Sequence, residues 1–469
     1  MNTDVVDVLV VGAGPTGLAL ACDLRRRGVS VRVIEQADHL FPGSRGKGIQ
    51  ARTLEVLDDL GVINAVLASG GPAPVGMVWQ DGERQGEHRM FEEVAPTVSE
   101  PYAGPWLVPQ WRTQEILLAR LTELGGSVDF GTALTGLAQD ADGVTAALSS
   151  DRPPIRARYA VAADGGRSTV RGLLGVAMTG ESVDPAPMLV ADVRIPTALD
   201  RLNWHFFVGA DGSYLSVCPL PGTEDFQLTA QFKDGSAPDT SAAGVRSVVA
   251  ARTHLTEADV SEVRWSSDFR PRAALADRFT VGRVFLAGDA AHIHSPAGGQ
   301  GLNTSVQDAY NLGWKLGQVI RYGADSALLD SYESERRPVA ADMLGLSTRI
   351  HRGEAKRGGA TRQLGLGYRG GPLSVGGAGN LLAGDRAPDG PLPDGGTIFD
   401  ALRGPHLTLL AVGTDAELPA LEGDLVHVRH LDAYEPYGKG LFLIRPDGYI
   451  GWAGEDATGL GEWLAKLRK

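Results

Sequence analysis

Apolar residues close to the start of the chain predict a strand, a helix and a second strand in succession. Residues 7–11 form a short β-branched run, as expected for a strand that is buried on both faces. Residues 18–27 have the pattern of a helix that ends at Gly28, and residues 29–34 form a second apolar run. Together they predict a βαβ unit, from which parallel α/β folds are built.

A second strand and helix of this kind stand far downstream. Residues 284–287 are an apolar run, and a glycine-rich turn follows at 296–301. Apolar side chains then recur at helical spacing, at Leu302, Val306, Ala309, Leu312, Leu316 and Ile320. We therefore expect a discontinuous first domain, made of residues 1–174 and 271–351.

The intervening segment, residues 175–270, has a different pattern. Runs such as "PMLVADVRI", "LNWHFFVG" and "DFQLTAQF" alternate or are β-branched, and Gly, Pro and Asp separate them. This pattern predicts an inserted antiparallel sheet, placed where it would cover a ligand of the first domain and form a substrate pocket. Residues 71–102 are left open between this sheet and the first domain.

The last part of the chain forms a third unit. An Arg/Gly-rich stretch, 352–384, has the composition of a linker, and residues 385–469 contain three apolar runs and a final helix. A small C-terminal α/β domain is expected, and 469 residues suffice for three domains.

The net charge, the number of cysteines and the lack of long apolar runs limit the kinds of binding partner and the cellular location that we expect. The net charge of −13 argues against nucleic acid and against an anionic membrane surface. The two cysteines, Cys22 and Cys218, form no Cys-x-x-Cys, so neither a redox disulfide nor a disulfide framework is expected. No signal peptide and no apolar run long enough for a membrane span is visible, so a cytoplasmic location is expected.

Three glycines between the first strand and helix indicate a dinucleotide site. Gly12, Gly14 and Gly17 form G-x-G-x-x-G, which provides a tight turn, close approach to a pyrophosphate and close helix–strand packing. The helix N-terminus offers free N–H groups to the phosphates. Glu35 ends the second strand, where a carboxylate can bind the hydroxyls of an adenosine ribose and would repel the 2′-phosphate of NADP.

The downstream strand also ends in an acid. Asp289 follows Gly288 at a position where parallel sheets bind ligands, and a second helix N-terminus begins near Gly301. Two helix N-termini suit a ligand with two anionic centres, such as a pyrophosphate and the pyrimidine edge of a reduced flavin.

Three motifs in this order resemble the FAD-dependent aromatic hydroxylases, the para-hydroxybenzoate and phenol hydroxylase family of flavoprotein monooxygenases. They are the glycine motif, "ADGGRSTVR" at 163–171 and "GDAAHIHSPAGGQGLN" at 288–303. "SRGKGIQARTLEVLDDLG", "YESERRP" and "GDRAPDGPL" are similar to the bacterial branch that acts on aromatic polyketides and related antibiotics.

The resemblance implies a fold and an activity. The fold would be a Rossmann-like FAD-binding domain, interrupted by an antiparallel β-sheet substrate domain and followed by a thioredoxin-like α/β domain without redox cysteines. The enzyme would use NADPH or NADH and O2 to hydroxylate a phenolic or polycyclic aromatic substrate through a flavin C4a-hydroperoxide. It would be a monomer or homodimer.

The resemblance also assigns residues. The implied cofactor-binding set is Gly12, Gly14, Pro15, Gly17, Glu35, Gln36, Arg45, Gln110, Leu134, Asp164, Gly165, Gly288, Asp289, Pro296, Gly299, Gly301, Leu302 and Asn303. Within it, Arg45 and Pro296 would position flavin and substrate, Gln110 and Asp289 would touch the ribityl chain, and Leu302 and Asn303 would present N–H groups to the flavin. No acid–base residue is assigned. Ser295 departs from the family pattern, in which two prolines are common at this point.

Several residues have competing interpretations. Trp204, Phe206 and Tyr214 are candidate pocket aromatics, or ordinary sheet core. His292 and His294 lack further ligands at metal spacing, so packing and hydrogen bonding beside the flavin are expected rather than a metal site. Asp164 either serves the ligand or only forms a turn, and Arg45 is either at the flavin or merely exposed.

The chemistry has alternatives as well. Baeyer–Villiger oxygen insertion, a flavin-dependent dehydrogenase or reductase, and a non-catalytic flavoprotein that binds aromatic compounds all stay open.

Overall fold

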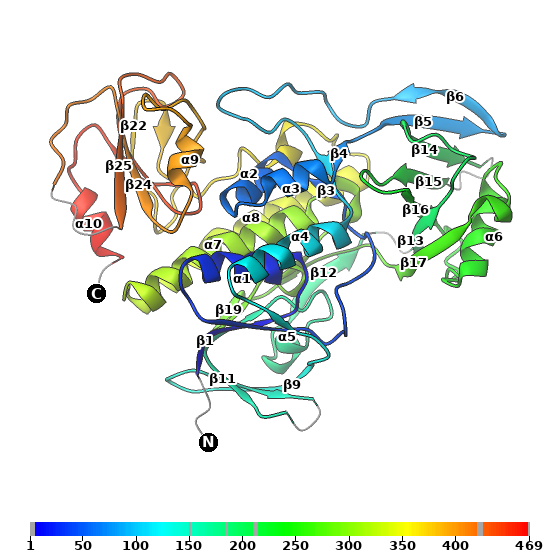
Figure 1. Cartoon of the computed structure of the whole chain (residues 1–469), viewed down its shortest axis with the longest axis horizontal. Helices are drawn as coiled ribbons and strands as arrows, with labels where there is room; N and C mark the ends of the chain where they lie inside the picture. The colour runs from blue at the N-terminus through cyan, green and yellow to red at the C-terminus, as the bar shows by residue number, and fades with distance from the viewer. Residues whose placement is uncertain (1–4, 150–151, 184–185, 210–213, 420–424, 468–469) are drawn as a thin grey trace.

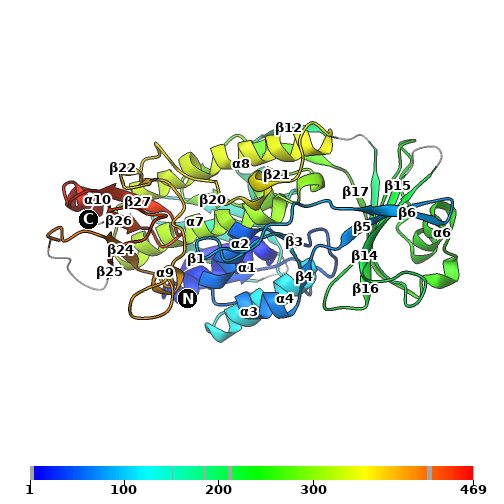
Figure 2. The same cartoon turned by 90° about the horizontal axis from the view of Figure 1, so that it is seen from above.

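The computed structural model describes residues 5–149, 152–183, 186–209, 214–419 and 425–467 (Figure 1). Residues 1–4, part of the stretch inspected for a signal peptide, lie outside this set. A central α/β domain separates a seven-stranded sheet domain from the C-terminal domain, which lie at opposite ends of the long axis (Figure 1 and Figure 2).

The central domain is built on a largely parallel sheet to which distant segments contribute. Its parallel strands are β1 (Val6–Val11), β2 (Val31–Ile34), β8 (Val128–Asp129), β11 (Ile155–Ala162) and β20 (Val284–Leu286), in the order β20-β11-β1-β2-β8. Antiparallel strands β9 (Leu134–Gln139), β10 (Val144–Leu148) and β19 (Thr280–Val281) extend it. Because β20 joins β11 after the inserted domain, the predicted interruption of the Rossmann-like fold is confirmed.

Helices cover this sheet. They are α1 (Pro15–Arg26), α2 (Ala51–Asp59), α3 (Ile63–Ala68), α4 (Gln110–Glu123), α5 (Thr169–Leu173), α7 (Gly301–Arg321) and α8 (Asp330–His351). Helices α1 and α7 pack closely because α7 presents two glycines to α1. A Cβ atom would lie 2.2 Å from Asp23 Oδ2 if placed on Gly313, and 2.8 Å from Arg27 Cδ if placed on Gly317.

The inserted domain is a sheet in the order β17-β13-β16-β15-β14-β5-β6. Its strands are β5 (Val75–Gln80), β6 (Glu83–His88), β13 (Met188–Arg194), β14 (Asn203–Val208), β15 (Tyr214–Pro219), β16 (Asp225–Gln231) and β17 (Glu262–Phe269). The sheet is antiparallel except for the β5–β14 pair, which is parallel because β5 arrives from the first domain. Strands β5 and β6 therefore place part of the open segment 71–102 in this sheet. Helix α6 (Ala242–Arg252) covers its outer face.

Two small sheets connect the domains. Strands β12 (Met178–Ser182), β18 (Arg272–Ala276) and β21 (His292–Ile293) form one, and β3 (Gly48–Ile49), β4 (Gly71–Pro72) and β7 (Trp106–Leu107) form the other. The first differs from the expected boundary at 175, since β12 pairs with β18 and takes no part in the seven-stranded sheet. Short 3₁₀ turns complete the chain: Glu257–Asp259, Gly288–Ala290, Pro296–Gly298, Ser326–Leu329 and Gly359–Arg362.

The C-terminal domain has the expected thioredoxin-like strand arrangement. Its sheet runs β23-β22-β27-β26-β24-β25, from β22 (Val375–Ala378), β23 (Leu381–Leu382), β24 (Leu407–Val412), β25 (Val426–Leu431), β26 (Gly440–Ile444) and β27 (Ile450–Gly454), with helices α9 (Ile398–Leu402) and α10 (Leu460–Ala465). Strands β24 and β25 are parallel, β26 is antiparallel to both β24 and β27, and β27 pairs in parallel with β22. The sheet starts before the expected boundary at 385, because β22 pairs with β27.

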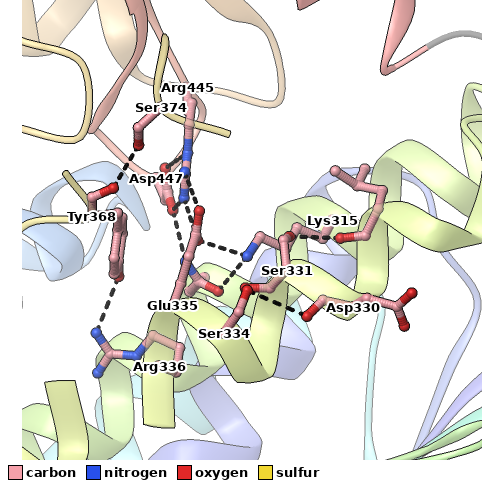
Figure 3. Close-up of polar contacts among 12 residues, drawn as sticks. Lys315, Asp330, Ser331, Ser334, Glu335, Arg336, Tyr368, Ser374, Arg445 and Asp447 are labelled. Atoms are coloured by element: carbon pink, nitrogen blue, oxygen red, sulfur yellow. Dashed lines mark hydrogen bonds and ion pairs between the residues drawn. The ribbon is translucent and has the colours of Figure 1, made fainter. Parts of the chain in front are cut away.

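A buried group of charges joins this domain to α7 and α8 (Figure 3). Arg445 donates hydrogen bonds to both carboxylate oxygens of Glu335, at 2.6 and 2.9 Å, and to both of Asp447, at 2.9 and 2.6 Å. Lys315 Nζ donates to Glu335 at 2.7 Å and to Asn311 at 2.8 Å. We call Lys315, Glu335, Arg445 and Asp447 the interdomain ion cluster; its two positive and two negative groups are almost completely buried.

Candidate active site

The carboxyl ends of the central strands bring the two motif stretches to one edge of the sheet. In the register, Val11 lies opposite both Ile34 and Ala162, and Ala162 lies opposite Leu286. The carboxyl ends of β1, β2, β11 and β20 therefore lie side by side at one edge of the sheet. The glycine loop, Glu35, the "ADGG" turn and the "GDA" turn consequently meet there.

The three motif glycines have different surroundings. Gly12 has φ +108°, and a Cβ there would lie 2.3 Å from the Ala163 carbonyl oxygen. A Cβ on Gly17 would lie 2.0 Å from the Gly12 carbonyl oxygen. A Cβ on Gly14 would meet no atom within 4 Å beyond its chain neighbours and the backbone of its own helix. The first and third glycines thus serve packing, while Gly14 borders open space at the N-terminus of α1, where Pro15 is the first helical residue.

Glu35 closes onto this loop. Its carboxylate accepts hydrogen bonds from the Ala13 N–H at 2.9 Å and the Ala37 N–H at 3.0 Å. A carboxylate has about four acceptor positions, so two stay available for ribose hydroxyls. Gln36 is exposed beside it, and Leu134, which begins β9, has a buried side chain that leaves only its backbone for the predicted adenine contact.

The "GDA" turn packs onto the start of α1. Gly288 has φ +63°, and a Cβ there would lie 2.6 Å from Thr16 Oγ1. The Asp289 side chain is accessible, yet protein surrounds it closely, and this desolvation raises the pKa of its carboxyl, while the charges of His292 and Arg45 oppose the rise. An accessible carboxylate whose pKa is raised by the surrounding protein is typical of a ligand-binding site.

The N-terminus of α7 adjoins this turn. The buried Asn303 side chain accepts from the Gln50 N–H at 2.8 Å and donates to the carbonyls of Gly48 at 2.9 Å and Gly299 at 2.7 Å. These bonds hold the loop before the helix, in which Gly299 has φ +63° and Pro296 is exposed. Residues 301–303 form the first turn of α7, where backbone N–H groups have no acceptor within the helix.

The loop that carries Arg45 lies between α4 and the inserted sheet. Gln110 Oε1 accepts from the Gly46 N–H at 3.0 Å. The exposed Arg45 guanidinium lies 4.9 Å from the Phe41 ring centroid and donates to Ser267 Oγ at 3.4 Å. Its pKa is lowered, mainly by desolvation, with Asp289 opposing and Arg167 adding to the effect. Arg45 thus contacts the inserted sheet through Ser267 and interacts electrostatically with Asp289, while its position at the flavin stays a prediction.

Asp164 has a structural partner for each oxygen. It accepts from Ser168 Oγ at 2.5 Å and from the Val170 N–H at 3.1 Å, which fixes the start of α5. The turn interpretation therefore accounts for its side chain, although burial raises the pKa of the carboxyl. Gly165 has φ +79° and borders open space, so a ligand could approach its backbone.

His292 and His294 belong to a buried hydrogen-bonded chain. His294 Nε2 lies 3.0 Å from His292 Nδ1, and His292 Nε2 lies 2.5 Å from Asp308 Oδ2. Arg336 donates to the other oxygen of Asp308 at 2.8 Å, and desolvation together with the His292 charge lowers the pKa of His294 to about 3. No group of three His, Cys, Asp or Glu side chains gathers around a metal position in the part of the chain that the structure describes.

The candidate pocket aromatics line the inner face of the inserted sheet. Trp204 and Phe206 are half-buried and stack at 5.5 Å between centroids, whereas His205 and Phe207 point to the opposite, buried face. Tyr214 is half-buried and starts the neighbouring strand. These three side chains are therefore not part of the outer core under α6.

Sequence reasoning missed Lys47, Asp192 and Gln227, which face the same space. Lys47 stands in the quoted stretch "SRGKGIQ", and Asp192 interrupts the apolar run "MLVADV". A lone acid within a strand that is otherwise buried was the available signal. In the described residues, no helix is long and apolar enough to cross a membrane.

Comparisons with known proteins agree with this geometry. Residues 5–347 match a family model described as FAD binding domain, and residues 380–468 match one described as aromatic-ring hydroxylase, C-terminal. The chain is 45% identical to a flavin-dependent monooxygenase of Mycobacteroides abscessus, over 98% of this chain and 99% of that protein. It is 36% identical to a 12-dehydrotetracycline 5-monooxygenase/anhydrotetracycline 6-monooxygenase of Streptomyces rimosus, over 98% of each.

Among solved structures, a ternary complex of aklavinone-11 hydroxylase with FAD and aklavinone has a TM-score of 0.81 at 26% identity, over 100% of this chain and 99% of that one. The FAD-binding model covers most of the chain, and these relatives align over almost their whole length. The chain therefore belongs to the family of FAD-dependent aromatic hydroxylases and is a flavoprotein monooxygenase.

Proposed function

We propose that this enzyme uses NADPH or NADH and O2 to hydroxylate a phenolic, polycyclic aromatic compound of the polyketide or antibiotic type. The observation that supports it most is the meeting of the glycine loop, the Asp289 turn and the α7 N-terminus at one edge of the sheet. The names of relatives, which include an anhydrotetracycline monooxygenase and an aklavinone hydroxylase, support the substrate class.

The adenosine half of FAD would lie along the first motif. The open space at Gly14 admits a pyrophosphate to the N-terminus of α1, where N–H groups and the helix dipole favour negative charge. Glu35 would bind the ribose through its two remaining acceptor positions. The backbone of Leu134 and the exposed Gln36 would border the adenosine.

The flavin half would lie along the second motif. Asp289 would accept a hydrogen bond from the ribityl chain, with Gln110 nearby, and the first turn of α7 would present N–H groups to the pyrimidine edge. FAD, when bound, would supply the redox chemistry by accepting hydride from NADPH or NADH and activating O2 at its C4a carbon. Arg45 and Pro296 would border flavin and substrate.

The substrate would lie between the flavin and the inner face of the inserted sheet. Trp204 and Phe206 already stack there and offer flat apolar surface to a polycyclic ring system. The sheet would thereby shield the reacting atoms from water, which strengthens the electrostatic effect of the nearby helix terminus.

Flavin retention tests the cofactor site. The variant Asp289→Ala should lose FAD during purification, measured as the ratio of flavin to protein absorbance. The matched control Asp415→Ala removes an exposed carboxylate in the C-terminal domain and should keep the wild-type ratio. Full flavin occupancy in Asp289→Ala would count against the assigned site.

Substrate-stimulated consumption of O2 and NADPH tests the reaction. Uptake of both, with oxygen from labelled O2 on a ring carbon of the product, is expected. Oxygen inserted beside a ketone would instead indicate Baeyer–Villiger chemistry, NADPH oxidation without O2 would indicate a reductase, and no consumption would indicate a binding protein.

A further inference from the structure

A half-buried lysine lies where the FAD-binding domain meets the inserted sheet. Gly46 packs against the start of α7, since a Cβ there would lie 3.4 Å from Leu302 Cδ1. The neighbouring Lys47 points to the sheet instead: its Nζ donates a hydrogen bond to Gln227 Oε1 and lies 4.3 Å from the Trp204 ring centroid. Lys47 therefore connects the loop beside the predicted flavin site to the stacked aromatic side chains Trp204 and Phe206.

A buried aspartate projects from the same sheet face. Asp192 on β13 lies opposite Gln227 on β16, and directly opposite residues of a β-pair project from the same face. Asp192 is 2% exposed, and among the described residues neither of its carboxylate oxygens makes a hydrogen bond of normal geometry, although Ser44 lies close enough to favour the ionised form. Burial of an unpaired carboxylate is costly, so the arrangement needs a reason other than stability.

Desolvation and neighbouring charges shift the pKa values of both Asp192 and Lys47. Desolvation raises the pKa of Asp192 to about 7; Ser44 and the Lys47 charge oppose the rise, and Asp225 adds to it. Desolvation also lowers the pKa of Lys47, with Cys218 and Asp192 opposing and Arg357 adding to the effect. Near neutral pH the aspartate can therefore take up or release a proton beside a cation.

The surroundings favour one kind of ligand. Trp204 and Phe206 stack with an interplanar angle of 23° and provide a flat apolar surface beside the ammonium. An aromatic ring resting on that surface would place an oxygen substituent at Lys47. An anionic oxygen would be favoured there, because a desolvated ammonium gains most from a close opposite charge.

We propose that Lys47 is the counter-ion for an ionised phenol or enol oxygen of the substrate, and that Asp192 takes up the proton which that oxygen loses. The O–H bond of the substrate breaks, an O–H bond forms on Asp192, and the negative charge moves from the carboxylate to the substrate oxygen. The total charge of the site stays the same. This inference rests on the proposed function, and it restricts the substrates to aromatic compounds with an acidic hydroxyl, whose ionisation makes the ring more nucleophilic.

The test uses the FAD-loaded enzyme and 1-hydroxyanthraquinone, a phenol that is neutral in water at about pH 8 and changes from yellow to red on ionisation. The wild type should bind it as the red anion. Calorimetry in two buffers with different ionisation heats should find almost no net proton release, because Asp192 takes up the proton.

Matched variants separate the two roles. Lys47→Met should bind the probe in its yellow form and roughly tenfold or more weakly, since a shift of one pKa unit is a tenfold preference, while Lys47→Arg should restore the red form. Asp192→Asn should keep the red form but release about one proton per probe molecule. The methyl ether of the probe should bind wild type and Lys47→Met equally.

Several results would overturn the inference: no binding by the wild type, a yellow bound probe, or equal proton release by wild type and Asp192→Asn. These readouts need no turnover. Turnover of a substrate that binds in its neutral form would therefore remove this inference alone, whereas anion binding without O2 or NADPH consumption would remove only the proposed function.

Discussion

Replacing Arg445 with methionine should strongly destabilise the junction between the C-terminal domain and helices α7 and α8. Arg445 makes four hydrogen bonds of 2.6–2.9 Å to two carboxylates that are almost completely buried. In its absence Glu335 keeps Lys315 and Asn311, but Asp447 keeps only the Asn311 amide, at 3.2 Å, among its described side-chain partners. Removing one partner of such a pair costs about 3–5 kcal/mol.

Urea unfolding, followed by tryptophan fluorescence, measures this cost. With a slope of about 3 kcal/mol per M, the midpoint should fall by roughly 1–1.7 M. The control is Arg369→Met, which removes an equally bidentate pair with Asp385, at 2.5 and 2.8 Å, from an arginine that is 63% exposed. That change should cost less than about 1 kcal/mol, because solvent screens the exposed pair.

A double variant tests the physical reason. Arg445→Met with Asp447→Asn leaves the balanced pair Lys315–Glu335 and should recover at least about 1 kcal/mol of the loss, since the two changes share a network. If Arg445→Met costs no more than Arg369→Met, or if the second substitution only adds to the loss, the argument from buried charge is wrong.

Three further predictions follow from the same structure. Gly14→Ala should abolish FAD binding and leave the urea midpoint of the FAD-free protein unchanged. Gly17→Ala should abolish FAD binding and also lower the free energy of unfolding by about 1–3 kcal/mol, since its Cβ would lie 2.0 Å from the Gly12 carbonyl oxygen. Desolvation opposes ionisation of Glu335, but the charges of Arg445 and Lys315 outweigh it and lower the pKa from 4.5 to about 2. The stabilisation that depends on the ionised form is complete above pH 4.5, and the free energy of unfolding should fall by about 3 kcal/mol as the pH is lowered to 2. Glu335→Gln should flatten this part of the plot of urea midpoint against pH. Desolvation raises the pKa of Asp192 from 3.8 to about 7, so its effect on the free energy of unfolding becomes steadily more unfavourable between these pH values and is complete above about pH 7. Asp192→Asn should therefore raise the urea midpoint at pH 8 and nearly match wild type at pH 4, and a lower midpoint at pH 8 would contradict the assigned desolvation.

The nucleotide half of the site could be predicted from the sequence because its signals are local. The strand, the glycines and the helix occupy residues 6–26. Gly12 and Gly17 are required by close backbone contacts, and Gly14 leaves space open at the N-terminus of α1. The link between this unit and Asp289 could also be predicted, since both follow an apolar strand and parallel strands end at a common edge.

The substrate half could not be predicted to the same depth. Lys47 and Asp192 are far apart in the chain, and neither has a local pattern; they meet only because β13 and β16 lie side by side over the loop around Gly46. The strand β22 was missed for a similar reason, since glycine-rich residues 375–378 become a strand only by pairing with β27. Pairing across long separations depends on the whole fold rather than on the segment.

The position of β20 and α7 in the chain has a consequence for biosynthesis. During translation β1 and α1 are synthesised early. Strand β20, which completes their sheet, and helix α7, which packs on α1, are synthesised only after the whole inserted sheet. FAD can thus be captured only after α7 has been synthesised, and products truncated before residue 321 should stay colourless. Nascent chains of increasing length, stalled by an arrest peptide and assayed for yellow colour, would locate FAD capture between the emergence of α7 and release of the full polypeptide.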